Sequence, residues 1–435
     1  MSARTSLALL ALAAVGVGCA PPAAVPPKAP PSPVVVDDGA AFVRSEDTLL
    51  RVLARDGRFA ARVGLFSEGG APDDYDPFDG KARAQAIAEA LRTFEEATKG
   101  SATPERRAAI LTAKAEAARA GLEAELTVYG AELLLALAEA ASDSPAAARE
   151  AADDATLAER IGDVNDAFST TKRSLAERRE VEDALDPLER LLVRRGGGAR
   201  YAKSLSALTK LRETTGEARA LGDAPLPDPR PRPLDAALVV VGEELRPDEV
   251  LATLGAAERT LEGLAKAKLA ELGEKTATTV TSDAGRRLAL RASCKVSIPT
   301  STLRSAAASP EREAGCLAVR ELAFAKTPAE EASALVALHD RVAVALWAAA
   351  FHTSRETLGA VRGRVHLLAT TDDRTRDALL RRATLTPALA LGSGLVAALV
   401  GASAEGTKER ATLLQRYGDA PIVMLREAVK ASSPK

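Results

Sequence analysis

The chain has 435 residues, and 46% of them are hydrophobic, which is enough apolar material to bury the cores of two or three domains. Its 58 Lys and Arg residues nearly balance its 60 Asp and Glu residues, so no overall field attracts nucleic acid. Aromatic residues make up only 3%, whereas platforms that stack single-stranded bases need exposed rings, so we expect no nucleic-acid partner.

The first residues of the chain predict an export signal. Arg4 supplies a short positive region, and residues 6–17 supply an apolar stretch that is too short to span a bilayer. Gly18 is small enough for a processing peptidase to accommodate. We therefore expect the protein to leave the cytosol.

A short motif at the end of this signal indicates how the signal peptide is removed. The stretch Val15-Gly16-Val17-Gly18-Cys19 resembles the lipobox of bacterial lipoprotein precursors, with Gly16 where Leu is usual. The resemblance covers only the signal region. It implies that residues 1–18 are a signal peptide and that Cys19 is acylated and becomes the mature amino terminus. The alternative is ordinary secretion, with cleavage after Ala20.

Residues 19–40 are predicted to form a proline-rich tether. Seven prolines fall within thirteen positions, which favours an extended polyproline conformation and prevents a packed core. At about 3.1 Å per residue, such a tether would hold the body some tens of ångströms from a membrane. Ala20 stands where the resembled lipoproteins commonly carry an Asp that retains them at the inner membrane. The resemblance therefore implies the outer membrane, facing the periplasm.

The other two cysteines form an even pair once Cys19 carries lipid. In an oxidising compartment we expect Cys294 and Cys316 to form a disulfide. A loop of this length contributes about 3 kcal/mol in the chain-entropy model. The alternative is two buried, reduced thiols, because a free cysteine behaves as a small hydrophobic residue.

The fold class predicted for the body is mainly α, built from antiparallel helical bundles, and residues 41–222 are the first bundle domain. Apolar side chains recur there at spacings of four and three, the pattern of a seam between packed helices. The two seams are Leu122, Leu126, Tyr129, Leu133 and Leu137, and Leu157, Ile161, Val164, Phe168, Thr171 and Leu175. The spacing then slips before Pro187, so we expect a bundle with bends rather than a long coiled coil.

Five dipeptides predict where helices begin. Each places a capping oxygen before a proline, whose missing N–H costs nothing in the first turn of a helix. They are Thr103-Pro104, Ser144-Pro145, Asp186-Pro187, Ser309-Pro310 and Thr327-Pro328. Glu330 stands three residues after Thr327 and completes a capping box.

A proline-rich boundary at residues 223–233 separates the first bundle from a second, mostly helical domain at residues 234–435. Within the second domain, Thr and Val residues at 276–303 could form a short β insert. Residues 383–404 are uncharged and long enough to cross a membrane. Because they include Pro387 and three glycines, we expect a buried helix or hairpin instead.

Three histidines are the candidates for metal chemistry: His339, His352 and His366. On one helix the first two point to different faces, and their spacing matches no zinc motif. We therefore interpret all three as core or surface histidines. The sequence nominates no catalytic residue, no cofactor and no metal ligand beyond these candidates.

These observations favour a membrane-tethered lipoprotein of the cell envelope, whose helical body acts as a scaffold or adaptor for another envelope protein. Two alternatives remain from the sequence. One is a metal-dependent envelope hydrolase that uses the three histidines. The other is a module that binds a small apolar ligand between helices of the second domain.

Overall fold

The mainly α prediction is confirmed by a computed structural model of the chain. The described residues form thirteen α-helices and one π-helix, and no β-strand occurs among them. The structure describes residues 38–54, 59, 80–101, 103–123, 154–170, 181–193 apart from 183, 187 and 191, 199–220, 233–273, 310–354, 366–369, 373–403, 406–417 and 420–432.

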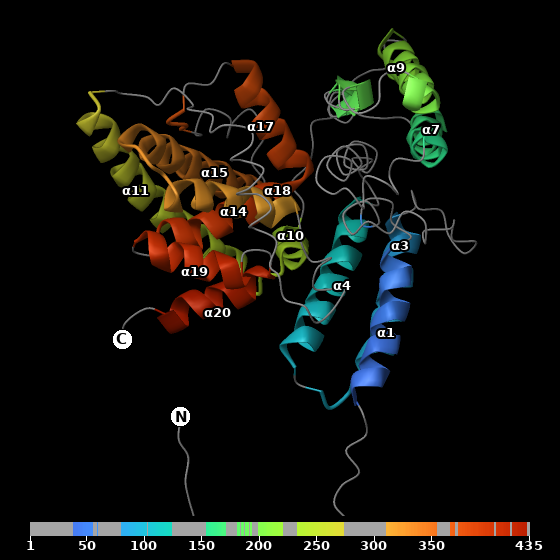
Figure 1. Cartoon of the computed structure of the whole chain (residues 1–435), viewed down its shortest axis with the longest axis horizontal. Coiled ribbons are helices and arrows are strands. Elements are labelled where there is room, and N and C mark those ends of the chain that lie inside the picture. The colour runs from blue at the N-terminus through green and yellow to red at the C-terminus, as the bar shows by residue number, and fades with distance from the viewer. Residues whose placement is uncertain are drawn as a thin grey trace, which may run out of the picture. The chain divides into compact units, whose positions relative to one another are not determined.

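Three helices that follow the predicted tether share one apolar core (Figure 1). They are α1 (Asp38–Leu53), α3 (Gly80–Ala97) and α4 (Pro104–Glu123). The buried side chains of this core, here called the tether-side cluster, are Leu49, Leu50, Leu53, Ala54, Phe59, Ile87, Leu91, Phe94, Ala109 and Ala113. Phe42 meets Phe94 edge to face with ring centroids 5.6 Å apart, so the start of α1 lies beside the end of α3.

Helices α7 (Asp154–Thr170) and α9 (Ala202–Ala220) pack against each other. Asp154 caps α9 from outside, because its carboxylate accepts the N–H of Lys203 at 2.9 Å and both the N–H and hydroxyl of Ser204 at 2.8 and 2.6 Å. Burial raises the pKa of Asp154, but these hydrogen bonds more than offset it, and the pKa lies below its ordinary value. The predicted seam is confirmed for its described buried members, Leu157, Ile161 and Val164.

The helices from α10 onwards share the largest core, apart from α17, whose buried Leu380 and Ala383 pack in a separate cluster with Trp347 and Phe351. Helix α11 lies along α15, and α18 contacts both α14 and α15. The helices are α10 (Leu234–Val241), α11 (Pro247–Glu271), α14 (Pro310–Ala323), α15 (Pro328–Ser354), α17 (Asp373–Leu385), α18 (Pro387–Val396), the π-helix η1 (Ala397–Gly401), α19 (Thr407–Tyr417) and α20 (Ile422–Ser432).

Three of the predicted helix starts are confirmed, at Pro104, Pro310 and Pro328. The Thr103 hydroxyl accepts the N–H of Arg106 at 3.2 Å. The pair Ser144-Pro145 lies outside the described residues. The prediction that Asp186 precedes the start of a helix is wrong, because residues 184–186 are already helical; Pro187 itself lies outside the described residues.

The capping box predicted before α15 forms in part. The Thr327 hydroxyl accepts the N–H of Glu330 at 3.1 Å, as expected for an N-cap residue. The Glu330 carboxylate reaches one residue further back than expected and accepts the N–H of Lys326 at 2.6 Å.

The described part of the uncharged run at residues 383–404 is largely buried up to Gly401, as predicted, but it is interrupted. Helix α17 ends at Leu385, and Thr386-Pro387 begins α18, a start of the same type that the sequence analysis missed. All five residues of η1 are buried. Among the described helices, residues 328–353 of α15 are long and apolar enough to cross a membrane, yet 72% of their most apolar window is buried inside the body. Both segments therefore serve as core.

Two glycines allow α18 to approach its neighbours closely. A Cβ at Gly394 would run into the Ala345 side chain and lie 3.1 Å from the Arg341 carbonyl oxygen of α15. A Cβ at Gly315 of α14 would run into the Ser393 carbonyl oxygen and lie 2.9 Å from Cβ of Val396. Helix α18 therefore packs directly on α15 at Gly394 and on α14 at Gly315. No space remains for a ligand between the helices at these two crossings.

We predict that Gly394→Ala lowers the free energy of unfolding by about 1–3 kcal/mol, because a methyl group has no room at this crossing. The control is Gly263→Ala on α11, where an added Cβ meets nothing within 4 Å. There the change should raise stability by about 0.5–1 kcal/mol, since alanine favours a helix over glycine. Urea unfolding followed by circular dichroism measures both. Equal effects of the two substitutions would contradict the close packing.

Several predictions fall outside the described residues and are not tested. They are the export signal, the tether up to residue 37, the first seam from Leu126 to Leu137, the second seam at Thr171 and Leu175, the possible β insert at 276–303 and the boundary at 223–232. The two predicted domains do meet, because α4 of the first contacts α10 of the second.

Candidate functional site

The candidate histidines do not gather at one point. His339 and His352 both lie on α15, where thirteen residues correspond to about 20 Å along the axis. Both side chains are buried, whereas His366 is exposed. Among the described residues, no group of three His, Cys, Asp or Glu side chains is arranged to hold a metal ion. The structure therefore gives the metal-dependent hydrolase no site in its described part.

Asp340 holds the segment at residues 366–369 against α15. Its carboxylate accepts the N–H of Leu368 at 2.8 Å and that of Ala369 at 3.0 Å, and it lies 2.9 Å from Nδ1 of His339. Three partners thus surround one carboxylate that is 15% exposed. This arrangement orients the buried imidazole and fixes the segment that carries His366.

The other two histidines have different surroundings. His352 packs edge to face on Phe351, and its Nε2 lies 3.4 Å from the Ala383 carbonyl oxygen of α17. The pKa of Glu262 on α11 is lowered mainly by a hydrogen bond from Lys266. His339 and His366 lower it further through their charges. His339 and His352 thus lie in the core, and His366 lies at the surface.

Cys316 is fully buried on α14 and belongs to the largest core. Its predicted partner, Cys294, lies outside the described residues. The disulfide between them therefore stays a prediction.

The most elaborate polar site lies at the turn between α10 and α11. Helix α10 ends at Gly242, whose φ of 70° is the left-handed conformation that favours glycine at this position. The Gly242 carbonyl accepts the N–H of Val423 at 2.9 Å, so the turn also caps the start of α20. A Cβ at Gly242 would lie 2.6 Å from Cβ of Pro421, which leaves room for glycine alone.

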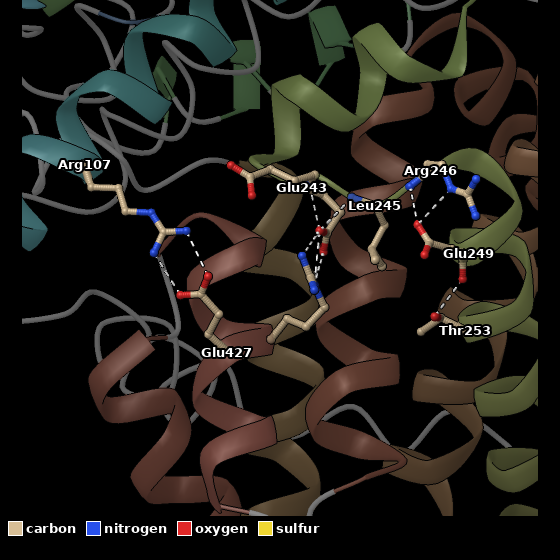
Figure 2. Close-up of polar contacts among 9 residues, drawn as sticks. Arg107, Glu243, Leu245, Arg246, Glu249, Thr253 and Glu427 are labelled. Carbon is tan, nitrogen blue, oxygen red and sulfur yellow. Dashed lines mark hydrogen bonds and ion pairs between the residues drawn. The ribbon is translucent and has the colours of Figure 1, made fainter.

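The next residue places a carboxylate inside this turn. The Glu243 side chain is fully buried, and its Oε1 accepts the N–H of Glu244 at 2.7 Å and of Leu245 at 3.1 Å (Figure 2). Arg426 of α20 donates to the same carboxylate through Nη2 at 2.8 Å and through Nε at 3.2 and 3.3 Å. The arginine compensates the charge of the carboxylate, and several donors surround it, which is the condition for a buried ion pair to stabilise a fold.

Two further contacts surround this turn. Glu249 accepts the N–H of Arg246 at 2.9 Å and so caps α11, which lowers the pKa of Glu249. Arg312 of α14 points Nη1 at the Val241 carbonyl oxygen, 3.4 Å away, at the negative end of α10. Side chains from α11, α14 and α20 therefore converge on one turn. We call Gly242, Glu243, Arg246, Glu249 and Arg426 the turn cluster.

An ion pair next to the turn cluster reaches α4. Arg107 forms two hydrogen bonds of 2.9 Å with Glu427, the residue after Arg426, and Figure 2 shows the two side chains facing each other. These hydrogen bonds raise the pKa of Arg107 and lower that of Glu427. Both side chains are about half exposed, so salt screens the pair.

Sequence reasoning missed the turn cluster. The signal that could have revealed part of it is Gly242 directly after an apolar helical stretch, which is typical of a helix end. The partner of Glu243 could not be found, because Arg426 lies 183 residues away. Chemically, the cluster orients helices, and its buried carboxylate has no hydrogen-bonding capacity directed towards solvent.

We predict that Glu243→Ala lowers the free energy of unfolding by about 3–5 kcal/mol, because it leaves Arg426 without its buried partner. The control is Glu249→Gln, which changes a half-exposed carboxylate in the same cluster and should cost about 1 kcal/mol or less. Thermal and urea unfolding measure both. A loss for Glu243→Ala no larger than that of the control would show that the buried pair does not stabilise the turn.

The fold and the turn cluster define a mainly α protein built from helical bundles. No protein-family model and no curated protein matches the chain. One solved structure that resembles it is "the putative lipoprotein from Colwellia psychrerythraea", with 12% identity and a TM-score of 0.46. The resemblance covers 91% of this chain and 98% of that one. A likeness of this size carries no conclusion about the activity of the chain.

Proposed function

We propose that the protein is a lipoprotein of the bacterial cell envelope. The observation that carries the proposal is Val15-Gly16-Val17-Gly18-Cys19, which follows a positive residue and an apolar stretch and precedes a proline tract. Acylated Cys19 would anchor the chain, and residues 19–40 would hold the helical body away from the lipid surface. Ala20 favours the outer membrane, with the body in the periplasm.

We further propose that the body is a scaffold or adaptor for another envelope protein. The support is the use of its carboxylates, since three of them hold helices or segments together. Asp154 caps α9, Glu243 fixes the turn between α10 and α11, and Asp340 holds residues 366–369. These three carboxylates are therefore part of the framework, and in this proposal the outer helix faces meet the partner.

We predict that Cys19→Ser abolishes membrane attachment, because serine lacks the sulfur that receives the lipid. In the parent chain, intact-mass analysis should find a mature amino terminus at Cys19 with the added mass of acyl chains, and fractionation should recover it with the outer membrane. The control is Gly263→Ala, where an added Cβ meets nothing within 4 Å, and it should leave both results unchanged. If Cys19→Ser keeps the parent's mass and fractionation, the lipoprotein proposal is wrong.

The scaffold proposal is tested by crosslinking intact cells that carry an affinity-tagged chain with a lysine-reactive reagent. We expect an adduct of defined mass with one envelope protein, and we expect it to weaken in the Cys19→Ser variant because the body is no longer concentrated at the membrane. A chain that is anchored but forms no specific adduct would contradict the scaffold while leaving the lipoprotein assignment in place.

A further inference from the structure

We draw no further inference here: the strongest candidate, the outward face of α11 with its exposed small residues Ala252, Ala256, Gly263, Ala267 and Ala270, carries no proposal because nothing in the described part of the structure shows what covers it.

Discussion

The buried carboxylate of Glu243 is the constraint on which the arrangement of the C-terminal helices depends. It cannot leave the interior without breaking two backbone hydrogen bonds and abandoning Arg426. Because Gly242 beside it also caps α20, the turn sets the direction in which α10 ends and α20 begins. The strict geometry of a buried ion pair thus fixes helices that lie far apart in the chain.

The same device recurs elsewhere in the body. Asp154 caps a helix that begins 48 residues later, and Asp340 accepts two backbone N–H groups from a segment without helix. Asp154 and Asp340 bind backbone amides of a distant part of the chain, whereas Glu243 binds those of the next two residues and a distant arginine; each satisfies donors that packing alone would leave unpaired. The chain has few aromatic side chains to fix how its Ala- and Leu-rich helices pack. Hydrogen bonds to carboxylates therefore help to orient these helices, in addition to apolar packing.

The sequence predicted those features that local patterns determine. Proline after Thr or Ser marked the starts of α4, α14 and α15, since both the cap and the missing N–H act within one turn. Asp186-Pro187 followed the same rule and failed, because neighbouring turns were already helical. The turn cluster escaped prediction altogether. Glu243 and Arg426 have no relation in sequence that a helical period or motif reveals, and only the folded chain brings them together.

The π-helix η1 restricts the insertion or deletion of residues at positions 397–401. A π turn contains one residue more than an α turn needs, and here it brings Gly401 to Leu338, where a Cβ would lie 3.2 Å from Cδ1. Deleting one residue from 397–401 would restore an ordinary helix yet rotate Gly401 by about 100°, so a side chain would face Leu338 instead. Insertions and deletions should therefore be rare in this segment.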